Sequence, residues 1–143
     1  MTEQNIRTLI RRAMEARMNS YSPYSGYMVG AALLCDKDVI IGGCNVENAA
    51  FSPTNCAERT AFFKAVSEGI KDFRAIAIVG GHRDAEKLDF AHPCGVCRQV
   101  MQEFCDADTF QIIVAKNESE YQIYKLRELL PYGFGPDNLK GDL

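Results

Sequence analysis

Residues 73–81 read FRAIAIVGG, a short apolar segment that ends at two consecutive glycines. This length and composition predict a buried strand from Phe73 to Val79. Helical patterns lie on both sides of the strand, at residues 56–68 and 93–105. A buried strand between two helices is typical of a sheet that is covered by helices. The segment therefore predicts an α/β protein.

A third helix is predicted near the start of the chain, where apolar residues recur at helical spacing in residues 3–18. Asn55 offers an N-cap side chain to the helix at residues 56–68, which stops at Gly69. Pro93 opens the helix that runs to Cys105.

The remaining strands are predicted at residues 29–35, 39–45, 109–115 and 121–126. The polar turn at residues 36–38 joins the first two into a hairpin. The order α-β-β-α-β-α-β-β predicts a single-domain α/β/α sandwich over residues 1–143, with a central mixed five-stranded sheet. Residues 129–135 contain proline and glycine and are predicted to lack regular structure.

The composition favours a small substrate over a nucleic-acid polymer. The chain has 143 residues, of which 24% are charged, and a net charge of -3. Proteins that hold long nucleic acids usually carry a basic stripe, which an acidic balance opposes. The first residues lack the apolar run of a signal peptide, and no stretch is long and apolar enough to span a bilayer. We expect a cytoplasmic protein without membrane contact, whose six cysteines are reduced.

Cysteine spacing predicts a metal site. Cys94 and Cys97 are three residues apart, which places both sulfurs on one face of a first helical turn. On its own, such a pair is as often a structural zinc knuckle or a redox pair as part of a catalytic metal site. Cys56 begins the other helix and can supply a third ligand. Three protein ligands leave one zinc position for water, which is the arrangement of a catalytic site.

Two neighbours of Cys56 complete the predicted site. The N-terminus of a helix stabilises a thiolate, and all three cysteines lie at predicted helix starts. A zinc ion with three thiolate ligands has a net charge of about -1, and this negative charge weakens the Lewis acidity of the zinc. Arg59 lies on the same helical face as Cys56 and is predicted to donate to the sulfurs and withdraw charge. Glu58 is predicted to carry protons at the helix end. Read alone, Arg59 and Glu58 would be ordinary solvated residues.

The other candidate ligands are interpreted as structural. His82 and His92 are predicted to be loop residues, and His92 directly precedes Pro93. The three remaining cysteines are interpreted as small buried hydrophobic residues: Cys35, Cys44 and Cys105.

Cys56-Ala57-Glu58 followed by Pro93-Cys94-x-x-Cys97 resembles the signature of the cytidine deaminase superfamily. The segments YSGYMVGAAL (24–33), GCNVENAA (43–50) and LLP (129–131) resemble the small homotetrameric nucleoside deaminases of this family, as does Phe134. The similarity covers about residues 5–140.

The resemblance implies that Cys56, Cys94 and Cys97 bind one zinc ion per subunit and that Glu58 shuttles protons. It implies substrate contacts from a further set of residues: Tyr27, Asn45, Glu47, Phe51, Ala57 and Phe134. Asn45 and Glu47 would bind the ribose hydroxyls, and their i, i+2 spacing projects both to one side of an extended strand end.

The aromatic residues of this set differ in how they match the family. Tyr27 stands where the family often has Phe, and Phe51 where it often has Tyr. Read without the family, Tyr27, Phe51 and Phe134 are core or interface aromatics. The resemblance places Phe134 over the pocket of a neighbouring subunit. It thus implies a homo-oligomer, a homotetramer with shared active sites.

The implied activity is zinc-dependent hydrolytic deamination of cytidine and deoxycytidine to uridine and deoxyuridine with release of ammonia, a step of pyrimidine salvage. A deaminase of an aminopyrimidine nucleoside antibiotic such as blasticidin S is the alternative within the enzyme class, and the Asn45–Glu47 segment favours the first. A polynucleotide editor is opposed by the acidic balance. A non-catalytic zinc module would leave Glu58 without a purpose.

Overall fold

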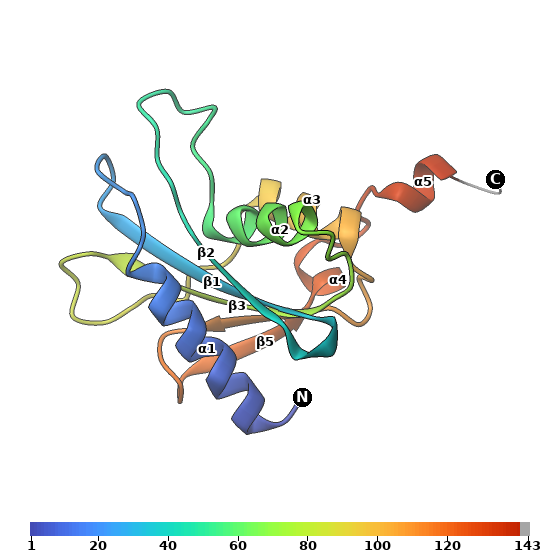
Figure 1. Ribbon diagram of the computed structural model, residues 1–143, viewed down its shortest axis with the longest axis horizontal. Coiled ribbons are helices and arrows are strands. Elements are labelled where there is room, and N and C mark those ends of the chain that lie inside the picture. Colours follow the sequence, from blue (N-terminus) through green and yellow to red (C-terminus); the bar gives the residue numbers. More distant parts are fainter. Residues whose placement is uncertain (141–143) are drawn as a thin grey trace.

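A computed structural model of the chain describes residues 1–140 and shows a central sheet between layers of helices (Figure 1). Its helices are α1 (Glu3–Arg17), α2 (Ala57–Ser67), α3 (Gly95–Phe104), α4 (Leu126–Leu129) and α5 (Pro136–Lys140). Its strands are β1 (Tyr27–Cys35), β2 (Ile40–Cys44), β3 (Phe73–His82), β4 (Gln111–Ala115) and β5 (Tyr121–Lys125). The short 3-10 turn Asp36–Asp38 joins β1 to β2.

The five strands form one sheet in the order β2-β1-β3-β4-β5. β3 and β4 run parallel, and the other neighbouring pairs run antiparallel. α3 lies in the crossover between the two parallel strands, a connection that antiparallel neighbours do not need. The predicted mixed five-stranded sheet is therefore confirmed, with the hairpin of β1 and β2 at one edge.

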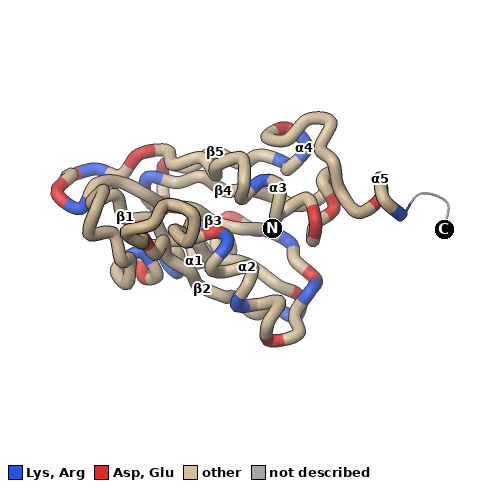
Figure 2. Tube along the Cα trace, turned by 90° about the horizontal axis from the view of Figure 1, so that it is seen from above, with Lys and Arg blue, Asp and Glu red and all other residues tan. Residues whose placement is uncertain are grey.

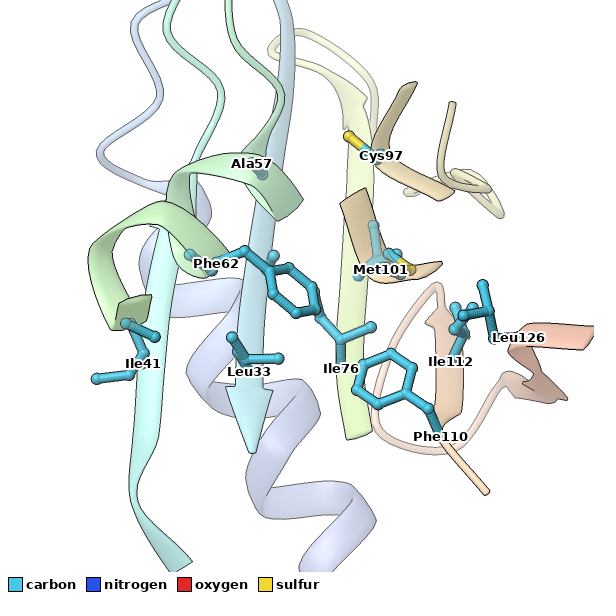
Figure 3. Packing of buried hydrophobic residues seen from close by; sticks show 14 of the residues in the cluster. Leu33, Ile41, Ala57, Phe62, Ile76, Cys97, Met101, Phe110, Ile112 and Leu126 are labelled. Atoms are coloured by element: carbon cyan, nitrogen blue, oxygen red, sulfur yellow. The ribbon is translucent and has the colours of Figure 1, made fainter. Parts of the chain in front are cut away.

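Helices cover both faces of the sheet. α1 packs one face through Ile6, Leu9 and Ile10, which join side chains of β1, β3 and β4 in one buried cluster. α2 and α3 pack the other face, where Phe62 and Met101 are fully buried (Figure 3). Apolar residues with adjacent sequence positions in β3 alternate between the two clusters, which is why the strand is apolar throughout.

Two helix starts differ from the sequence prediction. Cys56 is the N-cap of α2, with the extended backbone of that position, so Asn55 lies one residue outside the cap. The Asn55 amide instead donates to the Thr60 hydroxyl over 3.3 Å. Cys94, not Pro93, is the boundary of α3, and its sulfur accepts from the Cys97 N–H over 3.4 Å. Both cysteine groups therefore occupy helix caps.

The C-terminal part is more helical than predicted. The predicted strand at 121–126 ends at Lys125, because Leu126 starts the four-residue helix α4. A second short helix, α5, follows the proline and glycine residues at 131–135 and extends away from the sheet (Figure 1). The segment between α4 and α5 is irregular, as predicted.

Charged residues of both signs are interspersed along the chain (Figure 2). Lysine and arginine positions alternate with aspartate and glutamate positions in the view from above (Figure 2). Among the described residues, no helix has the length and apolar content that crossing a bilayer requires.

Candidate active site

The N-termini of α2 and α3 meet above the sheet and bring the three predicted cysteine ligands together. α2 approaches β2 closely at Gly43, where a Cβ atom would lie 2.6 Å from the Ala57 carbonyl oxygen and 2.6 Å from the Ala61 nitrogen. Only a glycine fits such an approach of a helix backbone to a strand. Gly43 therefore sets the position of the helix that carries Cys56.

The sulfur atoms of Cys56, Cys94 and Cys97 all lie within 4.8 Å of one another. The Sγ atoms of Cys56 and Cys94 are 3.6 Å apart. Zinc–sulfur distances of about 2.3 Å at tetrahedral angles place neighbouring sulfurs about 3.8 Å apart, so the cluster has the dimensions of a zinc site. It comprises three cysteines and no fourth cysteine or histidine among the described residues. The donor set therefore fits a zinc ion with one further position.

Arg59 lies against the sulfur cluster, as predicted. Its Nη2 donates to the Cys56 Sγ over 3.2 Å. Hydrogen bonding to Cys97, together with hydrogen bonds from Arg59 and Cys94, lowers the pKa of Cys56 to about 5. The pKa of Cys97 is raised, first because its proton is held in the hydrogen bond to Cys56. The hydrogen bonds that converge on Cys56 therefore favour its thiolate form, which is the form that binds metal ions.

Glu58 lies in the first turn of α2 and is a buried acidic residue, with 4% of its surface exposed. The pKa of Glu58 is raised to about 7, mainly because the carboxyl group is buried. A backbone hydrogen bond lowers this pKa, whereas the negative charge of Cys56 raises it further. A carboxyl group with a pKa near neutrality can both accept and return a proton at physiological pH. The position suits Glu58 for proton transfer beside the cluster.

A cavity of about 470 Å³ opens beside the sulfur cluster. Its size is within the range of sites for small organic molecules. Among the predicted residues it contains Tyr27, Asn45, Glu47, Cys56, Ala57, Glu58 and Cys94. The structure thus brings most of the predicted site residues to one cavity, whereas Cys97 is buried behind it and does not line it.

Asn45 is held firmly at the edge of this cavity. Its Oδ1 accepts from the Val29 N–H over 2.9 Å, and its Nδ2 donates to the Tyr27 carbonyl over 2.7 Å. The Ser20 hydroxyl also contacts Oδ1. One hydrogen of the amide nitrogen remains for another acceptor, since each amide carries two.

Glu47 follows two residues later and is oriented by the loop that precedes β1. Its Oε1 accepts from the backbone N–H groups of Tyr24 and Ser25, over 2.9 and 3.1 Å. Its Oε2 accepts from the Ser25 hydroxyl, and this hydrogen bond is the main cause that lowers the pKa of Glu47. Glu47 is therefore an ionised acceptor with a fixed orientation.

Part of the cavity wall was not predicted from the sequence: Ser25, Val29, Thr54, Asn55, Phe90, Ala91 and His92. Phe90 and His92 belong to the loop between β3 and α3, which turns back where the Asp89 N–H donates to the Gly80 carbonyl over 2.8 Å. The Lys116 ammonium lies over the Phe90 ring, 4.6 Å from its centroid. No periodicity marks this loop; only its position directly before Pro93 and Cys94 could have suggested that it lines the site.

Phe51 and Phe134 do not line this cavity. Phe51 is 91% exposed in the long loop between β2 and α2, and Phe134 is 57% exposed in the segment between α4 and α5. Of the remaining cysteines, Cys35 is buried, whereas Cys44 and Cys105 are partly exposed.

Comparison with known proteins shows the family. A family model described as the cytidine and deoxycytidylate deaminase zinc-binding region matches residues 3–113. A cytidine deaminase from Sporosarcina psychrophila is 42% identical over 135 residues, which cover 94% of this chain and 95% of the relative. A cytidine deaminase from Halalkalibacterium halodurans is 46% identical over 131 residues, with coverage of 92% and 95%.

Solved structures agree with the sequence relatives. The crystal structure of a cytidine deaminase from Burkholderia pseudomallei has a TM-score of 0.81 and 39% identity, with coverage of 94% of this chain and 100% of that chain. That of a cytidine deaminase from Mycobacterium tuberculosis has a TM-score of 0.75 and 35% identity, with coverage of 90% and 95%. The sulfur cluster, the matched region and these relatives lead to one conclusion: the chain belongs to the family of zinc-binding cytidine and deoxycytidylate deaminases.

Proposed function

We propose that this enzyme hydrolytically deaminates cytidine and deoxycytidine to uridine and deoxyuridine and releases ammonia. The observation that carries the proposal is the burial of Glu58 beside three clustered cysteine sulfurs, in a cavity that also holds Asn45 and Glu47. One end of the cavity thus offers a metal site with a proton carrier. The other offers an amide and a carboxylate that suit a sugar.

Cys56, Cys94 and Cys97 would hold the zinc ion, one per chain. When bound, zinc supplies Lewis-acid chemistry that lowers the pKa of water to about 7. Glu58 takes a proton from water and gives it to N3 of the cytosine ring, which makes C4 electrophilic. The hydroxide that remains adds to C4, and the C4–N3 double bond becomes single. Glu58 then takes the proton of the new C4 hydroxyl and passes it to the exocyclic amino group, so that the C4 carbonyl forms, the C4–N bond breaks and ammonia leaves. Arg59 withdraws negative charge from the Cys56 sulfur.

The sugar end follows from the contacts of Asn45 and Glu47. Glu47 is ionised and fixed by Ser25, so it can accept from a ribose hydroxyl. The free amide hydrogen of Asn45 can donate to the same hydroxyl. A hydroxyl group both donates and accepts, so the pair matches its two requirements. Tyr27 and Ala57 line the same cavity and would contact the base.

The proposed active form is a homo-oligomer, a homotetramer in which subunits share active sites. Support comes from the exposure of Phe134 and Phe51, two large aromatic side chains that do not line the cavity of their own chain. Phe134 would then cover the base pocket of a neighbour.

The proposed location is the cytoplasm. The six cysteines are all free thiols, which fits this reducing compartment.

The test is an ultraviolet assay of the purified protein with cytidine, deoxycytidine, free cytosine and blasticidin S, together with direct measurement of ammonia. We expect turnover of both nucleosides and much slower turnover of free cytosine, because cytosine lacks the sugar that Asn45 and Glu47 bind. Turnover of blasticidin S alone would identify an antibiotic deaminase. Zinc-loaded protein that turns over none of the four compounds would refute the proposal.

A further inference from the structure

The segment that carries Phe134 is attached to one face of α3. The Gln99 side chain donates from Nε2 to the Phe134 carbonyl oxygen over 2.7 Å. On the other side of the same peptide bond, the Gly135 N–H donates to Asn138 Oδ1 over 2.9 Å. Both polar groups of the peptide between residues 134 and 135 therefore have partners. Because the peptide group is planar, these two hydrogen bonds fix its orientation. The orientation of the peptide in turn restricts the direction in which the Phe134 side chain points.

Gln102, one turn further along α3, fills the space beneath the two glycines that flank Phe134. A Cβ atom at Gly133 would lie 3.0 Å from Gln102 Oε1, and one at Gly135 would lie 3.0 Å from Gln102 Cγ. The backbone thus lies directly on the Gln102 side chain at both positions. Residues three apart in a helix share a face, so Gln99 and Gln102 form a continuous support.

The same helix also contacts the start of this segment and the cysteine loop. Arg98 donates from Nε to the Pro93 carbonyl over 2.8 Å and from Nη1 to the Leu129 carbonyl over 2.7 Å. α3 therefore joins the residues before Cys94 to the end of α4 and to the segment with Phe134. Three side chains of α3 thus contact this segment or its start. These contacts hold the backbone of the segment but do not bury its aromatic side chains, because Tyr132 and Phe134 remain largely exposed.

We propose that Gln99 and Gln102 are positioning residues, which hold the 133–135 backbone so that Phe134 is presented in a fixed direction to the pocket of a neighbouring subunit. The proposal rests on the proposed role of Phe134. Gln99 acts by its hydrogen bond and Gln102 by packing, and neither touches the substrate. Rigid presentation reduces the ordering cost that a mobile aromatic side chain would pay when substrate binds.

The test begins with Gln99→Glu, which keeps the size of the side chain and replaces its donor with an acceptor. We expect the KM for cytidine to rise about tenfold with kcat within about twofold, the effect of one lost hydrogen bond on binding alone. Gln4→Glu makes the same chemical change on the exposed side of α1 and should leave both constants unchanged. Gln102→Ala is a second variant that acts through packing and should also raise KM.

A double-mutant cycle separates positioning from general structural damage. If Gln99 acts through Phe134, the pair Gln99→Glu and Phe134→Ala should be no worse than Phe134→Ala alone. Additive effects would show that Gln99 acts elsewhere and would overturn the proposal. An unchanged KM in both Gln99→Glu and Gln102→Ala would overturn it as well.

Limited proteolysis gives a readout that does not depend on the activity. Chymotrypsin cleaves after aromatic residues of segments that open, here Tyr132 and Phe134, and the C-terminal fragment is quantified by mass spectrometry. We expect about tenfold faster cleavage in Gln99→Glu than in Gln4→Glu, because the segment opens more often without its hydrogen bond. If the wild-type protein proves inactive on nucleosides, the proposed function fails, and equal cleavage rates would then separately refute the support by α3.

Discussion

Glu58 shows how much chemistry depends on the surroundings of one residue. As a side chain in a helical sequence it would be a solvated charge, and helical spacing alone places it away from Cys56. In the structure α2 packs against β1, β2 and α3, and the Glu58 carboxyl group is buried, which raises its pKa to about 7. The residue type was predictable from its motif, but its burial depends on segments far away in the sequence.

We expect Glu58→Gln to keep zinc and the fold while kcat falls by about 10² to 10⁴, the typical contribution of a positioned acid–base group. The amide has nearly the same shape as the carboxyl group but cannot carry the proton. Steady-state kinetics with cytidine measure the loss, and metal analysis with circular dichroism serves as the control. A variant with zinc bound and wild-type kcat would rule out Glu58 as the proton carrier.

The three clustered cysteines should bind one zinc ion per chain. Cys94→Ala removes a ligand, so the zinc content should fall well below one equivalent and activity should be lost. Cys44→Ala is the matched control, because Cys44 is a free thiol outside the cluster. The zinc-to-protein ratio is measured by elemental analysis after dialysis against a weak chelator. Full zinc content in Cys94→Ala would move the metal site elsewhere.

Glu47→Gln tests the sugar end of the cavity. The neutral amide is a weaker acceptor than the carboxylate and loses part of its hydrogen bonding to Ser25, so substrate binding should weaken by about 1–3 kcal/mol. KM for cytidine should therefore rise at least fivefold, whereas turnover of free cytosine should not change. An equal effect on both compounds would mean that Glu47 contacts the base or supports the fold rather than the ribose.

At the scale of elements, the site consists of two helix N-termini at one edge of the sheet. Sequence spacing predicted both helices because each shows a helical pattern of apolar residues next to its cysteines. It could not predict the cavity wall at Phe90 and His92, since the loop between β3 and α3 has no repeat and is shaped by the backbone bond from Asp89 to Gly80. The helices α4 and α5 were missed for a similar reason: with four and five residues, they are too short for a periodic pattern.

Gly43→Ala should separate α2 from β2 and weaken zinc binding. A Cβ atom there would lie 2.6 Å from the backbone of α2, so the helix must move and take Cys56 with it. We expect a loss of about 1–3 kcal/mol in the free energy of unfolding and easier removal of zinc by a chelator.

Gly30→Ala provides the comparison, because its Cβ atom would lie 2.1 Å from the Ala13 carbonyl oxygen of α1, on the opposite face of the sheet. This variant should lose stability in thermal unfolding without a change in zinc affinity. If both variants release zinc equally easily, α2 is not the element that Gly43 positions.

At the scale of the whole molecule, two aromatic residues of the proposed site, Phe51 and Phe134, lie outside the cavity. The long loop with Phe51 and the segment with Phe134 project from the body of the subunit, and both aromatic side chains are exposed. Sequence patterns could mark these residues only through their resemblance to a family, because exposure of an aromatic residue in a single chain does not say what covers it. The oligomer therefore needs a test that reports on which subunit supplies which residue.

Mixing two defective variants provides this test. Glu58→Gln chains lack the proton carrier but keep Phe134, and Phe134→Ala chains have the reverse. If each pocket combines Glu58 of one subunit with Phe134 of another, about a quarter of the pockets in randomly mixed assemblies should contain both residues. Co-expression with two different tags and purification through both yields such assemblies. Their activity at a cytidine concentration far below KM should exceed the mean of the two parent variants.

The control for this experiment pairs Glu58→Gln with Glu47→Gln. Glu47 and Glu58 line the same cavity of one chain, so no mixed assembly of these two variants can bring both residues together in one pocket. Recovery with Phe134→Ala and none with Glu47→Gln would mean that Phe134 crosses the interface while Glu47 does not. Mixed assemblies that form, as shown by both tags, but recover no activity with Phe134→Ala would place Phe134 over its own subunit and refute the shared pocket. An active monomer in sedimentation at assay concentration would refute it independently, since a pocket that works alone has no need of a neighbour's side chain.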